Sequence, residues 1–416
     1  MTIVSEAIQK NKGKIVDSIH THFRTYSMVI ALAVIWILFS ILTDHFFEPR
    51  NLSNLVRQTS LIAILAIGMV PVIVTGNIDL SVGSVVGFIS IIVAYCQYYI
   101  FPDFLGGLFP SFEAQTTFLG IETSMNGVIS TALSVIVAVI VGLLVGLWHG
   151  TLIAYLKIPA FIVTLGGYLA FRGGVLLVSG GRTISPVENS LVEIGQGYIP
   201  KNIGLILAVL VVACVFVSII WGRNQKFKYG FEKYPVYRDL LKAMAISAIV
   251  LFYVLYIANG YEGIQNPVLL MVIILMIFTY ITKNTRFGRY IYAYGGNKEA
   301  TRLSGINTSM IVFKVYILMG ILCAVCGVVL TGYVSAGTTS GGNLYELLTI
   351  AACVIGGTSL MGGEGTVVGA VVGALVMGSL NNGMDLLGWT NSKQWIVQGL
   401  VLIIAVYVDV VSKKKR

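Results

Sequence analysis

The sequence contains little charge: 11% of its 416 residues are Asp, Glu, Lys or Arg, whereas 56% are hydrophobic. A soluble globular domain carries about 25% charged residues, so water cannot be the solvent for most of this surface. In a lipid bilayer each backbone amide needs a partner inside the protein, which leaves α-helices or closed β-barrels. Barrel strands would alternate apolar and polar residues over roughly ten positions, but the apolar runs here are continuous and close to the ~20 residues that cross a bilayer. The sequence therefore predicts an all-α polytopic membrane protein.

Motifs for catalysis, nucleotide binding and metal binding are also missing. There is no GxxxxGK[ST] phosphate loop, so we expect this chain to bind no cofactor and not to hydrolyse ATP itself. The four His residues are scattered, and no catalytic constellation emerges. All five Cys lie in apolar runs, and the CxxC of Cys323 and Cys326 has no second pair, which favours packing thiols over a metal site. No cleavable signal peptide is apparent before the first apolar run. These absences argue against an enzyme.

Hydrophobic periodicity divides the chain into about 12 apolar segments. Several are short and two are interrupted by Gly, which is typical of broken helices buried in protein. The expected segments are 27–43, 58–75, 84–101, 128–152, 161–178, 203–221, 243–258, 267–282, 310–332, 345–361, 366–380 and 395–411.

The 27 Lys and Arg residues indicate the orientation of these segments. If the N-terminus is cytoplasmic, basic residues in the inner loops outnumber those in the outer loops roughly four to one, as the positive-inside rule requires. The longest outer loop, 102–127, then holds three acidic residues and no basic ones. Both termini are therefore expected in the cytoplasm. The net charge of +9 is mostly a topology signal and indicates no nucleic-acid partner.

The stretch GNIDLSVGS (76–84) places polar side chains between two apolar segments. A carboxylate at mid-bilayer costs roughly 2.5–3.5 kcal/mol on insertion scales, so Asp79 should face protein, water or a helix N-terminus. One interpretation is that Asp79 or Ser81 caps the following helix. The other is that Asn77, Asp79 and Ser81 belong to a gate in a translocation path.

A glycine-rich stretch, GGTSLMGGEGT (356–366), interrupts the apolar segments near the C-terminus. It is followed by Gly369 and Gly373, whose GxxxG spacing permits close helix packing. Packing is one interpretation. A break beside the pathway, involving Gly357, Thr358 and Ser359, is the other.

The inner loop 283–309 contains NKEATRLS between Gly296 and Gly305. This composition predicts a short surface helix with Asn297 as its N-cap. From the residues alone, the helix could be a solvated connector or a docking element for a soluble partner.

Taken together, five stretches resemble the permease subunits of bacterial ATP-binding-cassette (ABC) importers for monosaccharides, the ribose, xylose and galactose group. They occur in family order over about residues 25–410, and the D-xylose type is the most similar through LAFRG (169–173), TISP (183–186) and IGQGYIP (194–200). The chain departs from the usual GGIDLS by having Asn at position 77. The five stretches are 51–84, 159–173, 287–307, 346–369 and 394–409.

The resemblance implies the permease fold of the vitamin-B12 importer type, with a ten-helix core plus a helix pair inserted at about 203–258. It divides the chain into a cytoplasmic segment 1–26, a transmembrane permease domain 27–411 and a basic tail 412–416. It also implies a homodimer in the lipid bilayer, a cytoplasmic ATPase that docks on loop 283–309, and an extracytoplasmic sugar-binding protein. The residues expected to couple to the ATPase are Gly296, Asn297, Glu299, Ala300, Arg302, Leu303 and Gly305.

Two other functions stay open at this stage. The cargo could be a nucleoside or another small neutral solute, since related permeases carry such ligands. An ion-coupled secondary transporter would need acidic residues within its helices, and Asp79 is the one strong candidate. A membrane-embedded enzyme would need clustered catalytic residues at one interface, and the sequence contains no such cluster.

Overall fold

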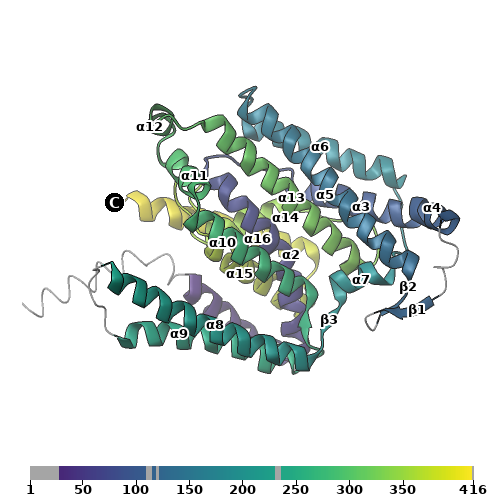
Figure 1. The fold of residues 1–416 in the computed structure, drawn as a ribbon, viewed down its shortest axis with the longest axis horizontal. Helices are drawn as coiled ribbons and strands as arrows, with labels where there is room; N and C mark the ends of the chain where they lie inside the picture. Colours follow the sequence, from purple (N-terminus) through teal and green to yellow (C-terminus); the bar gives the residue numbers. More distant parts are fainter. Residues whose placement is uncertain (1–27, 109–114, 119–120, 230–235, 415–416) are drawn as a thin grey trace, which may run out of the picture.

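The computed structural model describes residues 28–108, 115–118, 121–229 and 236–414, and these form a bundle of helices (Figure 1). The expected segment 1–26 and the last two residues of the tail lie outside the described residues. The first described helix is Met28–Leu42. It is followed by α2 (Pro49–Val74), α3 (Val82–Tyr95), η1 (Cys96–Ile100), α4 (Phe101–Leu108), α5 (Met125–Ala154), α6 (Ala160–Ser179), α7 (Asn189–Gln196), α8 (Lys201–Lys228), α9 (Val236–Leu251), η3 (Phe252–Ala258), α10 (Asn266–Asn284), α11 (Arg286–Gly296), α12 (Lys298–Leu303), α13 (Thr308–Val334), α14 (Tyr345–Ile355), α15 (Val367–Leu386) and α16 (Asn391–Lys414).

The class expected from composition is confirmed. Among the described residues, nine helices are long and apolar enough to cross a membrane, and Met28–Leu42 and Tyr345–Ile355 are shorter apolar helices. Two small antiparallel pairs of strands accompany them. These are β1 (Gln115–Phe118) with β2 (Ile121–Ser124), and β3 (Tyr198–Ile199) with β4 (Ile264–Gln265).

Several expected boundaries were wrong, for local reasons. Segment 345–361 is not one helix: α14 ends at Ile355, and Gly357 takes a φ of +82° that a right-handed helix cannot contain. The segment expected at 58–75 begins nine residues earlier, because Pro49 starts α2 at a position where its missing N–H costs nothing. Loop 102–127 is partly regular, since it contains α4 and the β1–β2 pair.

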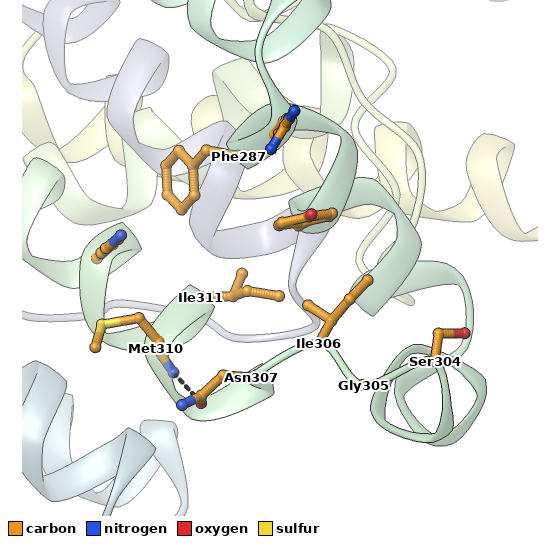
Figure 2. A pocket seen from close by; sticks show the side chains of 10 residues that line it. Phe287, Ser304, Gly305, Ile306, Asn307, Met310 and Ile311 are labelled. Atoms are coloured by element: carbon orange, nitrogen blue, oxygen red, sulfur yellow. Dashed lines mark hydrogen bonds between the residues drawn. The ribbon is translucent and has the colours of Figure 1, made fainter.

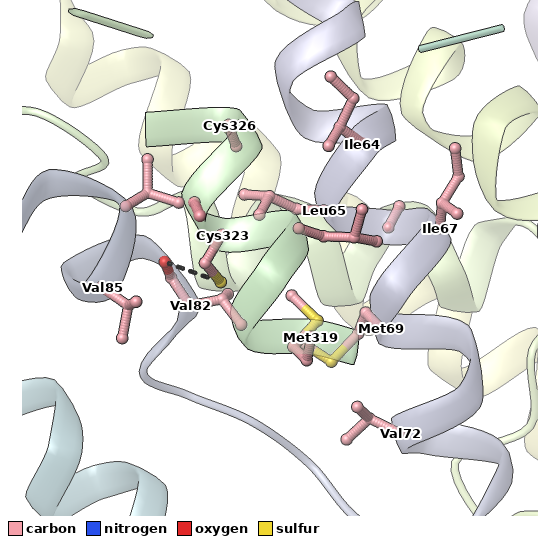
Figure 3. Close-up of a cluster of buried hydrophobic side chains, with 14 of the residues drawn as sticks. Ile64, Leu65, Ile67, Met69, Val72, Val82, Val85, Met319, Cys323 and Cys326 are labelled. Atoms are coloured by element: carbon pink, nitrogen blue, oxygen red, sulfur yellow. Dashed lines mark hydrogen bonds between the residues drawn. The ribbon is translucent and has the colours of Figure 1, made fainter. Parts of the chain in front are cut away.

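The core of the bundle surrounds α2, in which 83% of the most apolar 18-residue stretch is buried. Apolar side chains of α2, α3 and α13 interlock there (Figure 3). Cys323 and Cys326 lie in this cluster as buried free thiols, with Cys323 facing the Val82 carbonyl at 3.9 Å. The prediction that they are packing residues is therefore confirmed.

The helix pair α8–α9 lies at one side of the bundle (Figure 1). In the most apolar 18-residue stretch of α8 only 11% is buried, and in the corresponding stretch of α9–η3 only 22% is buried. The long apolar side chains that remain exposed, such as Leu210 and Ile249, would meet lipid. This pair coincides with the insertion expected at about 203–258.

Glycines bring the backbones of α5 and α13 into contact. A Cβ at Gly142 would overlap the carbonyl oxygen of Gly320, and a Cβ at Gly320 would overlap that of Gly142. One turn further along α5, a Cβ at Gly146 would come within 2.7 Å of the Tyr316 carbonyl oxygen. Small residues at such crossings permit the close approach that holds helices together in lipid. The expected GxxxG packing is also confirmed, because Gly369 and Gly373 of α15 lie against the backbone at Gly356 and Ala352.

Candidate functional site

Residues 283–309, which are expected to couple to an ATPase and are called the coupling segment below, fold as two short helices. Thr285 caps α11 by accepting a hydrogen bond from the Gly288 amide at 3.1 Å. Asn297 ends α11 and caps α12, accepting from the Ala300 amide at 2.9 Å. The predicted surface helix and its N-cap are therefore confirmed. Gly305 ends the turn after α12 with a φ of +80°, which favours glycine.

The solvent-exposed face of α12 combines an ion pair with an apolar side chain. Glu299 and Arg302 form a salt bridge at 2.6 Å, with both side chains more than 60% exposed. The hydrogen bond from Arg302, and then its charge, lower the pKa of Glu299, so this carboxylate stays ionised at neutral pH. Next to the pair, Leu303 is 76% exposed. An ion pair beside an exposed leucine offers both polar and apolar contacts to a soluble protein.

The coupling segment meets the two glycine-containing breaks through backbone contacts, which we call the glycine junction. Gly295, near the end of α11, lies so close to the Val74 carbonyl of α2 that no Cβ would fit, and its other neighbour is Gly363. The Gly363 amide donates to the Val74 carbonyl at 2.9 Å. The Tyr292 hydroxyl of α11 donates to the Gly365 carbonyl at 2.8 Å. Because these contacts are close, we expect a displacement of α11 to move the end of α2 and the loop 356–366 as well.

Asp79 organises the turn that follows α2. Gly76 turns the chain with a φ of +72°, and Asp79, only 3% exposed, accepts from the Ser81 amide at 2.8 Å and the Ser81 hydroxyl at 2.6 Å. Ser81 occupies the N-cap position of α3, but its hydroxyl donates to Asp79 instead of accepting from the helix. Asp79 thus fixes the entry to α3. The Asn77 side chain bonds back to Thr75 of the same turn at 3.1 Å.

Thr358 and Ser359 lie in the loop 356–366, buried against α2 and α15. The Thr358 amide donates to the Cys353 carbonyl and the Ser359 amide to the Glu364 carbonyl, both at 2.9 Å. The Thr358 hydroxyl is buried and has no hydrogen-bond partner among the described residues. In this conformation Asp79, Ser81, Thr358 and Ser359 are buried inside the helix bundle, and their place in a translocation path stays a prediction.

Sequence reasoning missed a buried aromatic cluster around His149 of α5. Its ring is 2% exposed and contacts Phe171 and Tyr316 with centroids 6.0 and 6.3 Å apart. A Cβ at Gly167 would come within 2.6 Å of His149 Nε2 and 3.3 Å of the Ser81 Cβ, so His149 borders the Asp79 turn. Within the part of the chain that the structure describes, neither His149 Nε2 nor the Tyr316 hydroxyl has a hydrogen-bond partner. Gly295 was missed as well; the available signal was the repeated glycines GG at 295–296 and 362–363.

This arrangement suits the transmission of a displacement from the surface of the protein to its interior. In the part of the chain that the structure describes, no group of three or more His, Cys, Asp or Glu side chains could hold a metal ion. What the geometry provides is an exposed helix at one end, a junction of closely packed backbones behind it, and two buried turns beyond that junction.

Comparison with known proteins identifies the family. The family model described as branched-chain amino acid transport system / permease component matches residues 51–406. The xylose transport system permease protein XylH of Escherichia coli (strain K12) is 39% identical over 396 residues, which cover 95% of this chain and 93% of that protein. The corresponding protein of Haemophilus influenzae is 38% identical over 398 residues, covering 95% of this chain and 98% of the relative.

The ribose import permease protein RbsC of Escherichia coli (strain K12) is 33% identical over 381 residues, covering 92% of each chain. No solved structure matches significantly. The resemblance noted in the sequence is thereby confirmed. The chain belongs to the branched-chain amino acid transport system / permease component family and is a membrane-embedded transport subunit of an ABC importer, not an enzyme.

Proposed function

We propose that this chain is the permease of an ATP-driven importer that carries a pentose, D-xylose or a similar sugar, across the bacterial cytoplasmic membrane. The support is that the relatives similar over more than nine-tenths of the chain carry xylose and ribose in their names. The path for a neutral sugar needs hydroxyl and amide groups more than charges. Ser81, Thr358 and Ser359 would supply such hydroxyls when the turns 76–81 and 356–366 move, because in this conformation they are buried inside the bundle.

The proposed assembly contains two copies of this chain, a cytoplasmic ATPase subunit and an extracytoplasmic sugar-binding protein. Each copy adopts the vitamin-B12 permease type of fold, with ten core helices, the additional pair α8–α9 and both termini in the cytoplasm. The low burial of α8–α9 and the excess of basic residues on one side support this arrangement. ATP is bound and hydrolysed by the partner subunit.

The glycine junction is the observation that carries the proposed mechanism. The ATPase presses on α12, and α11 transmits that displacement to Val74 and Gly363 because Gly295 leaves no slack between the backbones. The turns at 76–81 and 356–366 then shift together, and the pathway between the two protomers alternates its access. Gly296, Asn297, Glu299, Ala300, Arg302, Leu303 and Gly305 form the docking element.

Replacing both Glu299 and Arg302 with Ala tests the docking step. The pair is exposed, and solvent-exposed ion pairs contribute little to folding, so membrane insertion and thermal stability should persist. Binding of the ATPase should weaken roughly thirtyfold, the loss expected for a docking hot spot of about 2 kcal/mol. The measurement is co-purification and affinity of the ATPase for the permease in nanodiscs.

A matched control replaces Arg223 and Asp239, a second salt-bridged pair at 2.8 Å that lies between α8 and α9, with Ala. ATPase affinity should be unchanged in this variant. Unchanged affinity in the Glu299/Arg302 variant would contradict the docking role.

A nucleoside or another small neutral solute is the alternative cargo within the same mechanism. It is separated from the sugar by uptake assays in which unlabelled nucleoside or unlabelled xylose competes with the labelled sugar. The ion-coupled alternative depends on Asp79 and is tested by the substitutions described in the Discussion.

A further inference from the structure

A pocket of about 520 Å³ opens beside the coupling segment, between α11, the turn after α12 and the start of α13 (Figure 2). Two cations, Arg286 and Lys314, contribute to its wall, and no acidic side chain does. Neither cation forms a salt bridge with any residue that the structure describes. The pocket therefore has positive charge without an internal partner.

Apolar and aromatic side chains make up most of the remaining lining, beside the polar Ser304 and Asn307. Phe287, Ile306, Met310 and Ile311 line it, with Tyr290 at 37% exposure. Figure 2 shows Phe287, Ile306, Met310 and Ile311 around this space, and the Asn307 side chain bonded to the Met310 amide. Such a surface suits a molecule that carries negative charge at one end and hydrocarbon at the other.

The position of Lys314 places this charge at the depth of lipid headgroups. It follows the first residue of α13 by six positions, about 9 Å along the helix axis, in a helix apolar enough to span the membrane. An exposed lysine at this depth extends its ammonium group to the headgroup level. Next to the pocket, the Tyr155 hydroxyl contacts the Met310 sulfur at 4.0 Å, and Leu156 is 62% exposed, so an apolar surface continues toward the acyl chains.

We propose that this pocket binds the headgroup of an anionic phospholipid from the cytoplasmic leaflet. Arg286 and Lys314 would hold the phosphate, and the apolar wall would contact the first part of the acyl chains. Basic pockets between helices on the cytoplasmic side bind acidic headgroups for this reason. A lipid bound there would touch the turn 304–307 that joins α12 to α13, and so would stiffen the coupling segment. The side of the membrane rests on the proposed topology.

The test measures lipid binding to the purified full-length permease by native mass spectrometry, with phosphatidylglycerol and phosphatidylcholine as probes. The permease should retain phosphatidylglycerol selectively. The Arg286→Gln/Lys314→Gln variant should bind it about thirtyfold more weakly, the factor expected for two cations near the headgroup. A matched variant, Lys283→Gln/Arg289→Gln, removes the same charge from exposed positions of the same segment outside the pocket and should bind as the parent does.

Equal weakening in both variants would overturn the proposal, because the interaction would then be unspecific surface attraction. Displacement of the lipid by inorganic phosphate alone would overturn it too, since the pocket would be a free-phosphate site. Equal retention of the two lipids would also contradict it. The lipid assay contains no ATPase and no sugar, so its outcome does not depend on the proposed function. A permease that retains the lipid in this assay but binds no ATPase in the nanodisc experiment would refute the proposed function and leave the lipid site intact.

Discussion

Replacing Gly295 with Ala should destabilise the permease by about 3 kcal/mol and uncouple ATP hydrolysis from uptake. The added methyl group would overlap the Val74 carbonyl oxygen and lie 2.5 Å from the Gly363 amide nitrogen, and neither backbone atom can rotate away as a side chain would. The hydrogen bond from Gly363 to Val74 would be broken as α11 moves outward. Thermal unfolding of the purified protein and sugar-stimulated ATPase activity in proteoliposomes measure the two effects.

The neighbouring glycine provides the control. A Cβ at Gly296 would meet nothing within 4 Å, although Gly296 belongs to the same helix end. Gly296→Ala should therefore change the unfolding free energy by less than about 0.5 kcal/mol, as surface substitutions do. Equal stability of the Gly295→Ala and Gly296→Ala proteins would show that the glycine junction is not tightly packed.

Replacing Asp79 with Ala should cost about 3 kcal/mol and abolish uptake. Ser81 would keep a buried amide and a buried hydroxyl with no acceptor, and each unsatisfied buried donor costs about 1–3 kcal/mol. The start of α3 would lose its fixed entry, and His149 and Tyr316 would border a poorly ordered turn. Thermal unfolding and uptake of labelled sugar by whole cells are the measurements.

Asp79→Asn separates the structural role of this residue from a role in ion coupling. The amide keeps an oxygen that can accept from Ser81 but removes the charge. We expect stability within about 1 kcal/mol of the parent and ATP-dependent uptake that persists when the ion gradient is dissipated. Stable protein without uptake would instead show that the carboxylate charge itself is needed for transport.

Much of the fold could be predicted because its main determinant is one-dimensional. A run of apolar residues must be helical in lipid, and its ends are marked by polar residues that the sequence shows directly. The errors occurred at helix ends, which apolar length does not determine. The segment expected at 345–361 ends early because Gly357 takes a φ of +82° that the helix cannot contain, and the loop after Ile355 then packs against α2 and α15.

In the candidate site, local features could be predicted from the sequence, but contacts between distant residues could not. The capping of α12 by Asn297 was predictable, since an N-cap acts within three residues of its own position. The proximity of Gly295 to Val74 and Gly363 was not, because these residues are far apart in the chain and glycine carries no side chain that indicates its neighbour. His149 was also missed, because the rings that bury it, Phe171 and Tyr316, belong to two other helices.

The glycine contact between α5 and α13 restricts how this protein can move. Where Gly142 and Gly320 meet, rigid main-chain atoms fill the interface, and no flexible side chain can repack to let one helix slide along the other. We therefore expect the two helices to move as a single rigid body during a transport cycle. Hinge and shear displacement is left to interfaces with larger side chains, such as the tilted stack of Phe88 on α3 and Phe171 on α6.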